Sequence, residues 1–112
     1  MSQVAAQKTL PLDKRLAWVV LQNGRMEGKV FSLVGDTVIG QGPNAQIQVT
    51  GDAGSSAHVT ILNDGVHFWL LNHARDGFAR VGATAIASGA KVKLSDGDVI
   101  TVGSASVIFK SL

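Results

Sequence analysis

The chain has 112 residues, enough for one domain with its own core, and it contains no cysteine, which excludes disulfides and thiolate metal sites. Its formal net charge is only +2 and its basic residues are scattered, which argues against nucleic acid as a partner. The longest apolar run, Leu16 to Leu21, is too short to span a bilayer, and Met1 to Leu10 lacks the apolar segment of a secretory signal. The composition therefore predicts a soluble, cytoplasmic domain without direct membrane insertion.

Residues 1–14 carry few large apolar groups, and we expect them to form a flexible N-terminal arm that precedes a folded domain at 15–112. Ala17 to Gln22 is rich in β-branched and aromatic residues and predicts a strand. Asn23-Gly24 is a strong turn signal that leads to a partner strand at Lys29 to Leu33. The domain therefore opens with a hairpin.

Short apolar runs separated by turn residues continue to the C-terminus, and the glycines between them leave little room for a helix. Asn63 to Gly65 predicts a tight turn, and Ser95 to Gly97 predicts a hairpin that joins the strands on either side of it. We expect an all-β fold, a two-sheet antiparallel β-sandwich of about eleven short strands. The further strands are expected at residues 37–39, 47–49, 58–61, 66–72, 78–81, 84–86, 91–94, 98–102 and 105–109.

The stretch from Ile39 to His58 organises the rest of the chain. It contains two loops of small residues, at 40–46 and at Gly51 to Ser56, with one short strand between them. Exposed backbone amides in such loops suit the binding of a polar ligand. Loops on either side of one strand emerge at opposite ends of a sheet unless the strands shift, so the geometry decides whether they act together.

Two glycine patterns resemble nucleotide-binding loops but lack the required context. Gly40 to Ala45 fits a loose dinucleotide motif, yet residues 46–49 read as a strand rather than the helix that would face the pyrophosphate. Gly24 to Lys29 mimics a phosphate loop, but its glycine spacing is one residue short and Val30 replaces the required Ser or Thr. We reject both, and no cofactor is expected.

Asp52, Ser55, Ser56 and His58 could be drawn as an acid, nucleophile and base, but their spacing alone is weak evidence because such triads are defined by geometry. The histidines match no metal-ligand spacing either. We therefore expect neither catalysis nor a metal site, and an enzyme remains a low-ranking alternative.

Four motifs occur together in an order that resembles the forkhead-associated (FHA) domain, a phosphothreonine-binding β-sandwich of the FHA/SMAD type. Gly28 with Phe31 to Leu33 matches the family's Gly-x-x-Phe-x-Leu, and Val38 to Gln41 lies at its Ile-Gly-Arg position. Ser55 to His58 matches Ser-x-x-His, and Leu94 to Gly103 matches Leu-x-x-Gly-Asp-x-Ile-x-Ile-Gly. The resemblance covers nearly the whole chain and implies two twisted sheets with recognition loops at one end.

The resemblance also assigns candidate site residues around the first two loops. Gln41 stands where the family has its phosphate-binding Arg, and Ser56 stands where it often has another Arg. Ser55 keeps the hydroxyl that would donate to phosphate, while Gly40 and His58 are implied as structural supports. A missing charged donor is expected to weaken phosphate binding.

The family's Asn-Gly pair, which holds the peptide backbone, falls near Asp76-Gly77, although Gly82 could carry the second half of that motif instead. An acid at Asp76 would repel a phosphate dianion. Arg75 or Arg80 could replace the missing cation if their loop folds toward Ser55.

We therefore predict a protein–protein interaction module with weakened or lost phosphothreonine recognition and a scaffold or assembly role. Genuine phosphothreonine-peptide binding in kinase-linked signalling, through Ser55 with Arg75 or Arg80, is the alternative. The resemblance also includes eroded FHA-like domains of bacterial secretion-apparatus rings, which implies a place on the cytoplasmic side of a membrane-associated assembly. The sequence leaves the oligomeric state open.

Overall fold

The computed structural model describes residues 17–24, 26–42, 45–49 and 57–112, so the arm expected at 1–14 lies outside the described residues. Within the described part, eleven strands and no helix are present, which confirms the predicted all-β fold. Nothing in this part of the chain forms a helix long and apolar enough to cross a membrane. The strands are β1 (Ala17–Leu21), β2 (Val30–Ser32), β3 (Thr37–Gly40), β4 (Ile47–Gln48), β5 (His58–Asn63), β6 (Phe68–Asn72), β7 (Ala79–Val81), β8 (Thr84–Ala85), β9 (Lys91–Lys93), β10 (Val99–Val102) and β11 (Ala105–Ser111).

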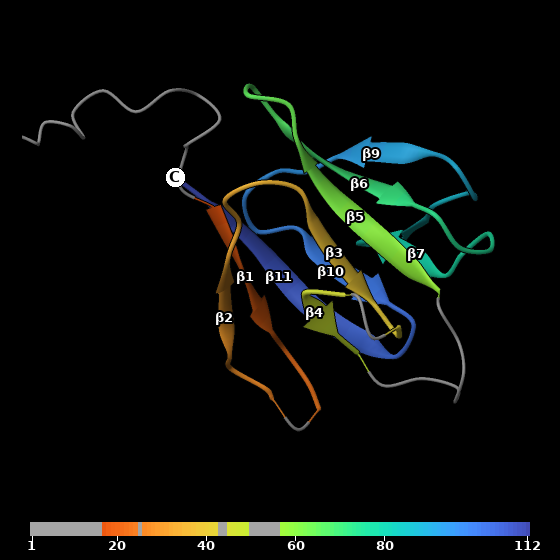
Figure 1. Ribbon diagram of the computed structural model, residues 1–112, viewed down its shortest axis with the longest axis horizontal. Coiled ribbons are helices and arrows are strands. Elements are labelled where there is room, and N and C mark those ends of the chain that lie inside the picture. The colour runs from red at the N-terminus through yellow and green to blue at the C-terminus, as the bar shows by residue number, and fades with distance from the viewer. Residues whose placement is uncertain (1–16, 25, 43–44, 50–56) are drawn as a thin grey trace, which may run out of the picture.

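The strands build two sheets that pack face to face (Figure 1). The first sheet has the order β2-β1-β11-β10-β7-β8, and the second has the order β4-β3-β5-β6-β9. Neighbouring strands run antiparallel in both sheets, apart from β3 and β4, which run parallel. Each sheet is therefore assembled from distant parts of the chain, and the sandwich matches the predicted architecture.

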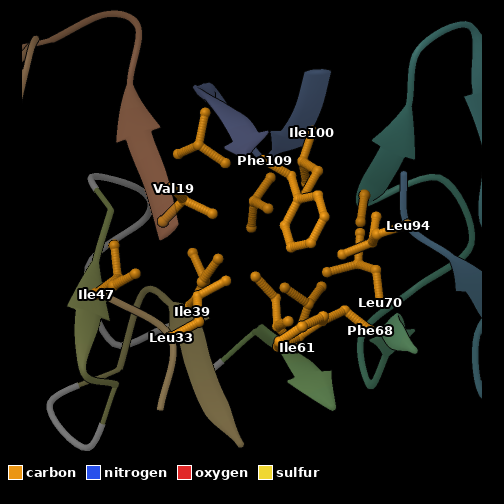
Figure 2. Close-up of a cluster of buried hydrophobic side chains, with 14 of the residues drawn as sticks. Val19, Leu33, Ile39, Ile47, Ile61, Phe68, Leu70, Leu94, Ile100 and Phe109 are labelled. Atoms are coloured by element: carbon orange, nitrogen blue, oxygen red, sulfur yellow. The ribbon is translucent and has the colours of Figure 1, made fainter. Parts of the chain in front are cut away.

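The core lies between the sheets because alternate residues of each strand point inward. Figure 2 shows Val19, Ile100 and Phe109 of the first sheet facing Ile39 and Leu70 of the second. All of these side chains are at most 1% exposed. Burying an aliphatic or aromatic side chain of this size contributes about 1.5–3 kcal/mol, so this layer supplies most of the stability of the frame.

The predicted tight turn at Asn63 to Gly65 joins β5 to β6, and the Asp64 carboxylate organises it. This carboxylate accepts hydrogen bonds from the backbone N–H of Val66 (2.8 Å) and His67 (2.6 Å), and from the Trp69 indole (2.8 Å). The bonds favour the charged form, with that from His67 having the largest effect, and they lower the pKa of Asp64 to about 2.

The hairpin predicted at Ser95 to Gly97 is wrong, although the turn itself is present. The backbone N–H of Asp98 donates to the Ser95 carbonyl at 3.0 Å, which closes a tight turn. However, β9 before the turn belongs to the second sheet and β10 after it belongs to the first. The turn therefore carries the chain across the core from one sheet to the other.

Strand β4 decides where the two central loops lie. It is only two residues long and pairs in parallel with the end of β3, in the register Ile39 to Ile47 and Gly40 to Gln48. Parallel strands end at the same edge of a sheet, so the segments that leave β3 and β4 share one end of the sandwich. The start of β5 at His58 lies opposite Gly40 at this end as well. The described residues that flank the two loops therefore lie at the same end.

The turn that crosses the core gives a test of backbone strain. Gly97 has a φ of 91°, and no atom lies within 4 Å of the place where a Cβ would be. A substitution there would therefore cause backbone strain but no steric clash. We expect Gly97→Val to lower the free energy of unfolding by about 1–3 kcal/mol in urea denaturation. Gly35→Val is the matched control, because Gly35 is equally open and has no positive φ. Ser95→Ala should have a smaller effect, and equal losses at Gly97 and Gly35 would contradict the assignment.

Candidate functional site

Gly40 allows β3 and β5 to approach closely at the loop end of the second sheet. A Cβ on Gly40 would lie 2.5 Å from the Cβ of His58 and 2.7 Å from the carbonyl oxygen of Ala57. Both distances are too short for any side chain, so only glycine fits without moving β5. The residue after it, Gln41, is tied to the same segment, because its backbone N–H donates to the Ala57 carbonyl at 3.0 Å.

The Gln41 side chain lies against the turn between β10 and β11. A Cβ built on Gly103 would be 3.3 Å from Gln41 Nε2 and 3.3 Å from Cε1 of Phe78. The amide of Gln41 and the ring of Phe78 therefore both lie close to Gly103. The backbone also joins these segments, because the N–H of Gly103 donates to the Phe78 carbonyl at 2.9 Å.

Arg75 is the candidate cation that the structure places against Phe78. Its guanidinium lies over the Phe78 ring, 5.1 Å from the centroid, in a cation–π contact. Gln41, Phe78 and Arg75 thus form a series of neighbouring groups, which we call the Gln41–Arg75 rim. Arg80, in contrast, is an exposed residue within β7, in register with Thr101 of β10.

Asp76 and Gly77 fasten the β6–β7 loop to the segment after β8. The Asp76 carboxylate accepts a hydrogen bond from the backbone N–H of Ser88 at 2.7 Å. Gly77 has a φ of 76°, and its N–H donates to the Ile86 carbonyl at 3.0 Å. The Asp76 side chain therefore makes a hydrogen bond within the domain.

Asn72 holds the same loop, and the sequence analysis missed it. Its amide nitrogen donates to the carbonyls of Arg75 and Ile86, both at 2.9 Å, and its amide oxygen accepts from the N–H of Ala74 at 2.9 Å. The side chain is completely buried. The signal was available in the alternation of β6, because every second residue from Phe68 faces the core and Asn72 is the polar member of that series.

His58 and His73 stack beneath these loops, with ring centroids 4.6 Å apart. His73 Nε2 lies 2.9 Å from the hydroxyl oxygen of Thr60, and its backbone N–H donates to the His58 carbonyl at 3.2 Å. Burial and, secondarily, repulsion from His58 lower the pKa of His73. Within the described residues, no third His, Cys, Asp or Glu joins the pair to form a metal site.

The remaining candidates, Ser55 and Ser56, lie outside the described residues, so their roles stay predictions. Of the others, Gln41 and Arg75 share the Gln41–Arg75 rim. The rim also involves Phe78 and Gly103, which the sequence analysis did not name as site residues. The approach of Gln41 to Gly103 joins segments that are distant in the chain and leaves no local signal, whereas Arg75 and Phe78 are close in the sequence.

No protein-family model matches the chain, and no curated protein does either. Similar solved structures exist. An FHA domain studied for phosphothreonine-dependent interactions is 28% identical, with 87% of this chain and 97% of that one covered and a TM-score of 0.68. The FhaA FHA domain, complexed with the intracellular domain of Rv3910, is 29% identical over 84% of this chain and 99% of that one, with a TM-score of 0.67. The FHA domain of an Arabidopsis thaliana hypothetical protein is similar in fold, at 21% identity over 93% and 92% of the two chains and a TM-score of 0.75.

The buried amide of Asn72 gives a prediction about the loop. Asn72→Leu keeps a similar volume but removes the acceptor of the Ala74 N–H, and a buried unsatisfied group costs about 1–3 kcal/mol. The carbonyls of Arg75 and Ile86 each lose one of two donors, because the N–H groups of Phe78 and Gly77 still donate to them. We expect a clear fall in the urea midpoint and faster amide exchange in the β6–β7 loop. Asn63→Leu, at a half-buried position at the end of β5, is the control and should cost less. Unchanged exchange in the loop of Asn72→Leu would refute its organising role.

The histidine pair gives a prediction about pH. The fold disfavours the protonated ring of His73, so the unfolded chain binds that proton more readily. The stability from the neutral ring is complete above the ordinary pKa of 6.5 and is lost as the pH falls through the lowered value. Thermal unfolding below pH 6.5 should therefore show a decline that is smaller in His73→Gln. The same decline in both proteins would exclude His73 as its source.

Proposed function

The chain folds as an FHA domain, and on this basis we propose that it is a protein–protein interaction module with a weakened phosphothreonine site and a scaffold or assembly role. The similar FHA domains support a binding role rather than an enzymatic one, because one is studied for phosphothreonine-dependent interactions and another is in complex with a partner domain. A domain with such a weakened site would suit a structural role on the cytoplasmic side of a membrane-associated assembly.

The observation that carries this proposal is the neutral amide at Gln41. In the resemblance this position holds the Arg that binds phosphate, and an amide supplies no positive charge. A hydrogen bond to a charged group contributes about 1.5–3 kcal/mol, so the exchange should weaken phosphopeptide binding roughly ten- to hundredfold. The Gln41 amide lies beside Gly103 and Phe78, and the resemblance implies recognition loops at this end of the sandwich.

Phosphothreonine recognition through Arg75 is the second candidate function. The contact between its guanidinium and the Phe78 ring favours Arg75 over Arg80, because it sets a cation on the Gln41–Arg75 rim. A guanidinium that stacks on an aromatic face keeps its N–H groups available at the edge, where they can bind a phosphate. The carboxylate of Asp76 accepts the Ser88 N–H, which ties its side chain to the segment after β8.

A titration with a phosphothreonine peptide and its unphosphorylated twin tests the first candidate. We expect the native domain to bind the phosphopeptide weakly, and Gln41→Arg to raise its affinity at least tenfold in isothermal titration calorimetry. The gain should shrink with added salt, because ions screen a guanidinium–phosphate contact. Ser32→Arg, at an exposed position of β2, adds the same charge away from the rim and should leave the affinity unchanged.

Arg75→Ala separates the two candidates. Tight binding by the native domain that Arg75→Ala abolishes would replace the weakened-site proposal with recognition through Arg75. An absence of binding by the native domain and by Gln41→Arg would mean that the loops no longer recognise phosphate, and the partner would then contact another face of the sandwich.

A further inference from the structure

Strand β9 forms one margin of the second sheet and has a neighbour on one side only. Figure 1 shows it beside β6, with which it pairs antiparallel. Trp69 of β6 lies opposite Lys93 in this pairing, and Leu71 lies opposite Lys91. Within the part of the chain that the structure describes, no other strand pairs with β9. The ladder of the second sheet therefore ends at this strand.

The backbone groups of Lys91 and Lys93 face the open side of β9. The N–H of Leu94 donates to the Phe68 carbonyl at 2.8 Å, so these two residues form a hydrogen-bonded pair with β6. Such pairs alternate with non-bonded pairs along an antiparallel ladder, so Val92 also bonds toward β6 whereas the two lysines point away from it. No described residue bonds to the backbone of either lysine. Two donors and two acceptors are therefore open at this margin.

The same two lysines carry charge that the described residues do not neutralise. Both side chains are exposed, and they share the outer face of the sheet with Trp69. The ammonium group of Lys91 lies 4.6 Å from the Trp69 ring centroid, a cation–π contact that holds it in place. Among the described residues, the only ion pair joins Lys110 to Asp96. Neither lysine of β9 is therefore paired with a carboxylate there.

An extended acidic segment matches this margin in its backbone and in its charge. Its N–H and C=O groups would continue the ladder, which is the mode of recognition called strand addition. Acidic residues at alternate positions would then lie opposite the two lysines, with Cβ atoms about 4.5–5.5 Å apart, so their carboxylates could reach the ammonium groups.

The lysines also exclude other segments. Lysine on an edge strand normally discourages the addition of another strand, because a neutral or basic segment gains nothing from the charge or is repelled by it. Antiparallel pairing of β9 with β9 of a second copy would set lysine opposite lysine, which is destabilising. The margin therefore favours an acidic segment over a second copy of the same edge.

We propose that β9 binds an extended acidic segment of a partner protein, which adds a strand to the second sheet. The other outer strands are less suitable, since β4 and β8 have only two residues each. Strand β2 has three, but Val30 to Ser32 carry no charge that would select a partner. The contact at β9 uses no residue of the Gln41–Arg75 rim, so it goes beyond the proposed phosphothreonine site.

A titration of the full chain with a blocked peptide of sequence Glu-Val-Glu-Val-Glu, followed by nuclear magnetic resonance, tests this contact. We expect the amide signals of Lys91 and Lys93 to shift and their hydrogen exchange to slow, because their N–H groups become bonded. The binding should weaken with added salt. The peptide Lys-Val-Lys-Val-Lys should leave both signals unchanged.

Charge reversal identifies the side chains that select the peptide. Lys93→Glu should weaken binding of the acidic peptide by roughly tenfold or more. Lys29→Glu is the matched control, because it makes the same change of charge at an exposed lysine outside β9, and it should have a much smaller effect. Lys91→Glu with Lys93→Glu should reverse the preference, so that the lysine peptide binds in place of the acidic one.

An N-methylated form of the acidic peptide separates strand addition from simple charge attraction. Methyl groups on the amides that face β9 keep the charge but block the backbone hydrogen bonds, so binding should be lost. Equal binding of the methylated peptide would overturn the proposal. Unchanged signals of Lys91 and Lys93 at about 1 mM acidic peptide would also overturn it. So would equal weakening by Lys93→Glu and Lys29→Glu, because the peptide would then bind elsewhere.

Discussion

The loop end of the sandwich depends on one buried amide. Asn72 ends β6 with its side chain fully enclosed, and its hydrogen bonds fix the backbone at Ala74, Arg75 and Ile86. A buried polar group of this kind is stable only when all of its partners are in place, so it selects one conformation of the loop. The position of Arg75 over Phe78 follows from that conformation. The conformation of the loop therefore also decides that Arg75 belongs to the Gln41–Arg75 rim.

Most of the frame could be predicted from the sequence because it follows local rules. Alternation of apolar and polar residues marks the strands, and Asn23-Gly24 marks a true hairpin. The turn at Ser95 misled the interpretation, because turn chemistry fixes a change of direction but not the sheet to which the next strand belongs. The site was only partly predictable. A motif located Gln41, whereas its contact with Gly103 arises between strands that are distant in the chain.

The sandwich treats its two outer faces unequally. Gln41 and Arg75 lie at one end of the sandwich, while the first sheet exposes the aliphatic side chains of Val30 and Val99. The two regions are built from different residues.

The shortness of β4 also has a consequence at the edge of the second sheet. An edge strand with unpaired backbone groups invites another chain to add a strand, and proteins counter this with short or interrupted edges. Here β4 covers only the end of β3, and the side-chain oxygen of Gln46 accepts the hydrogen bond of the Val38 N–H at 2.9 Å. A side chain thus occupies the donor that a foreign strand would need. The short strand and the Gln46 side chain thus protect this margin of the sheet against aggregation.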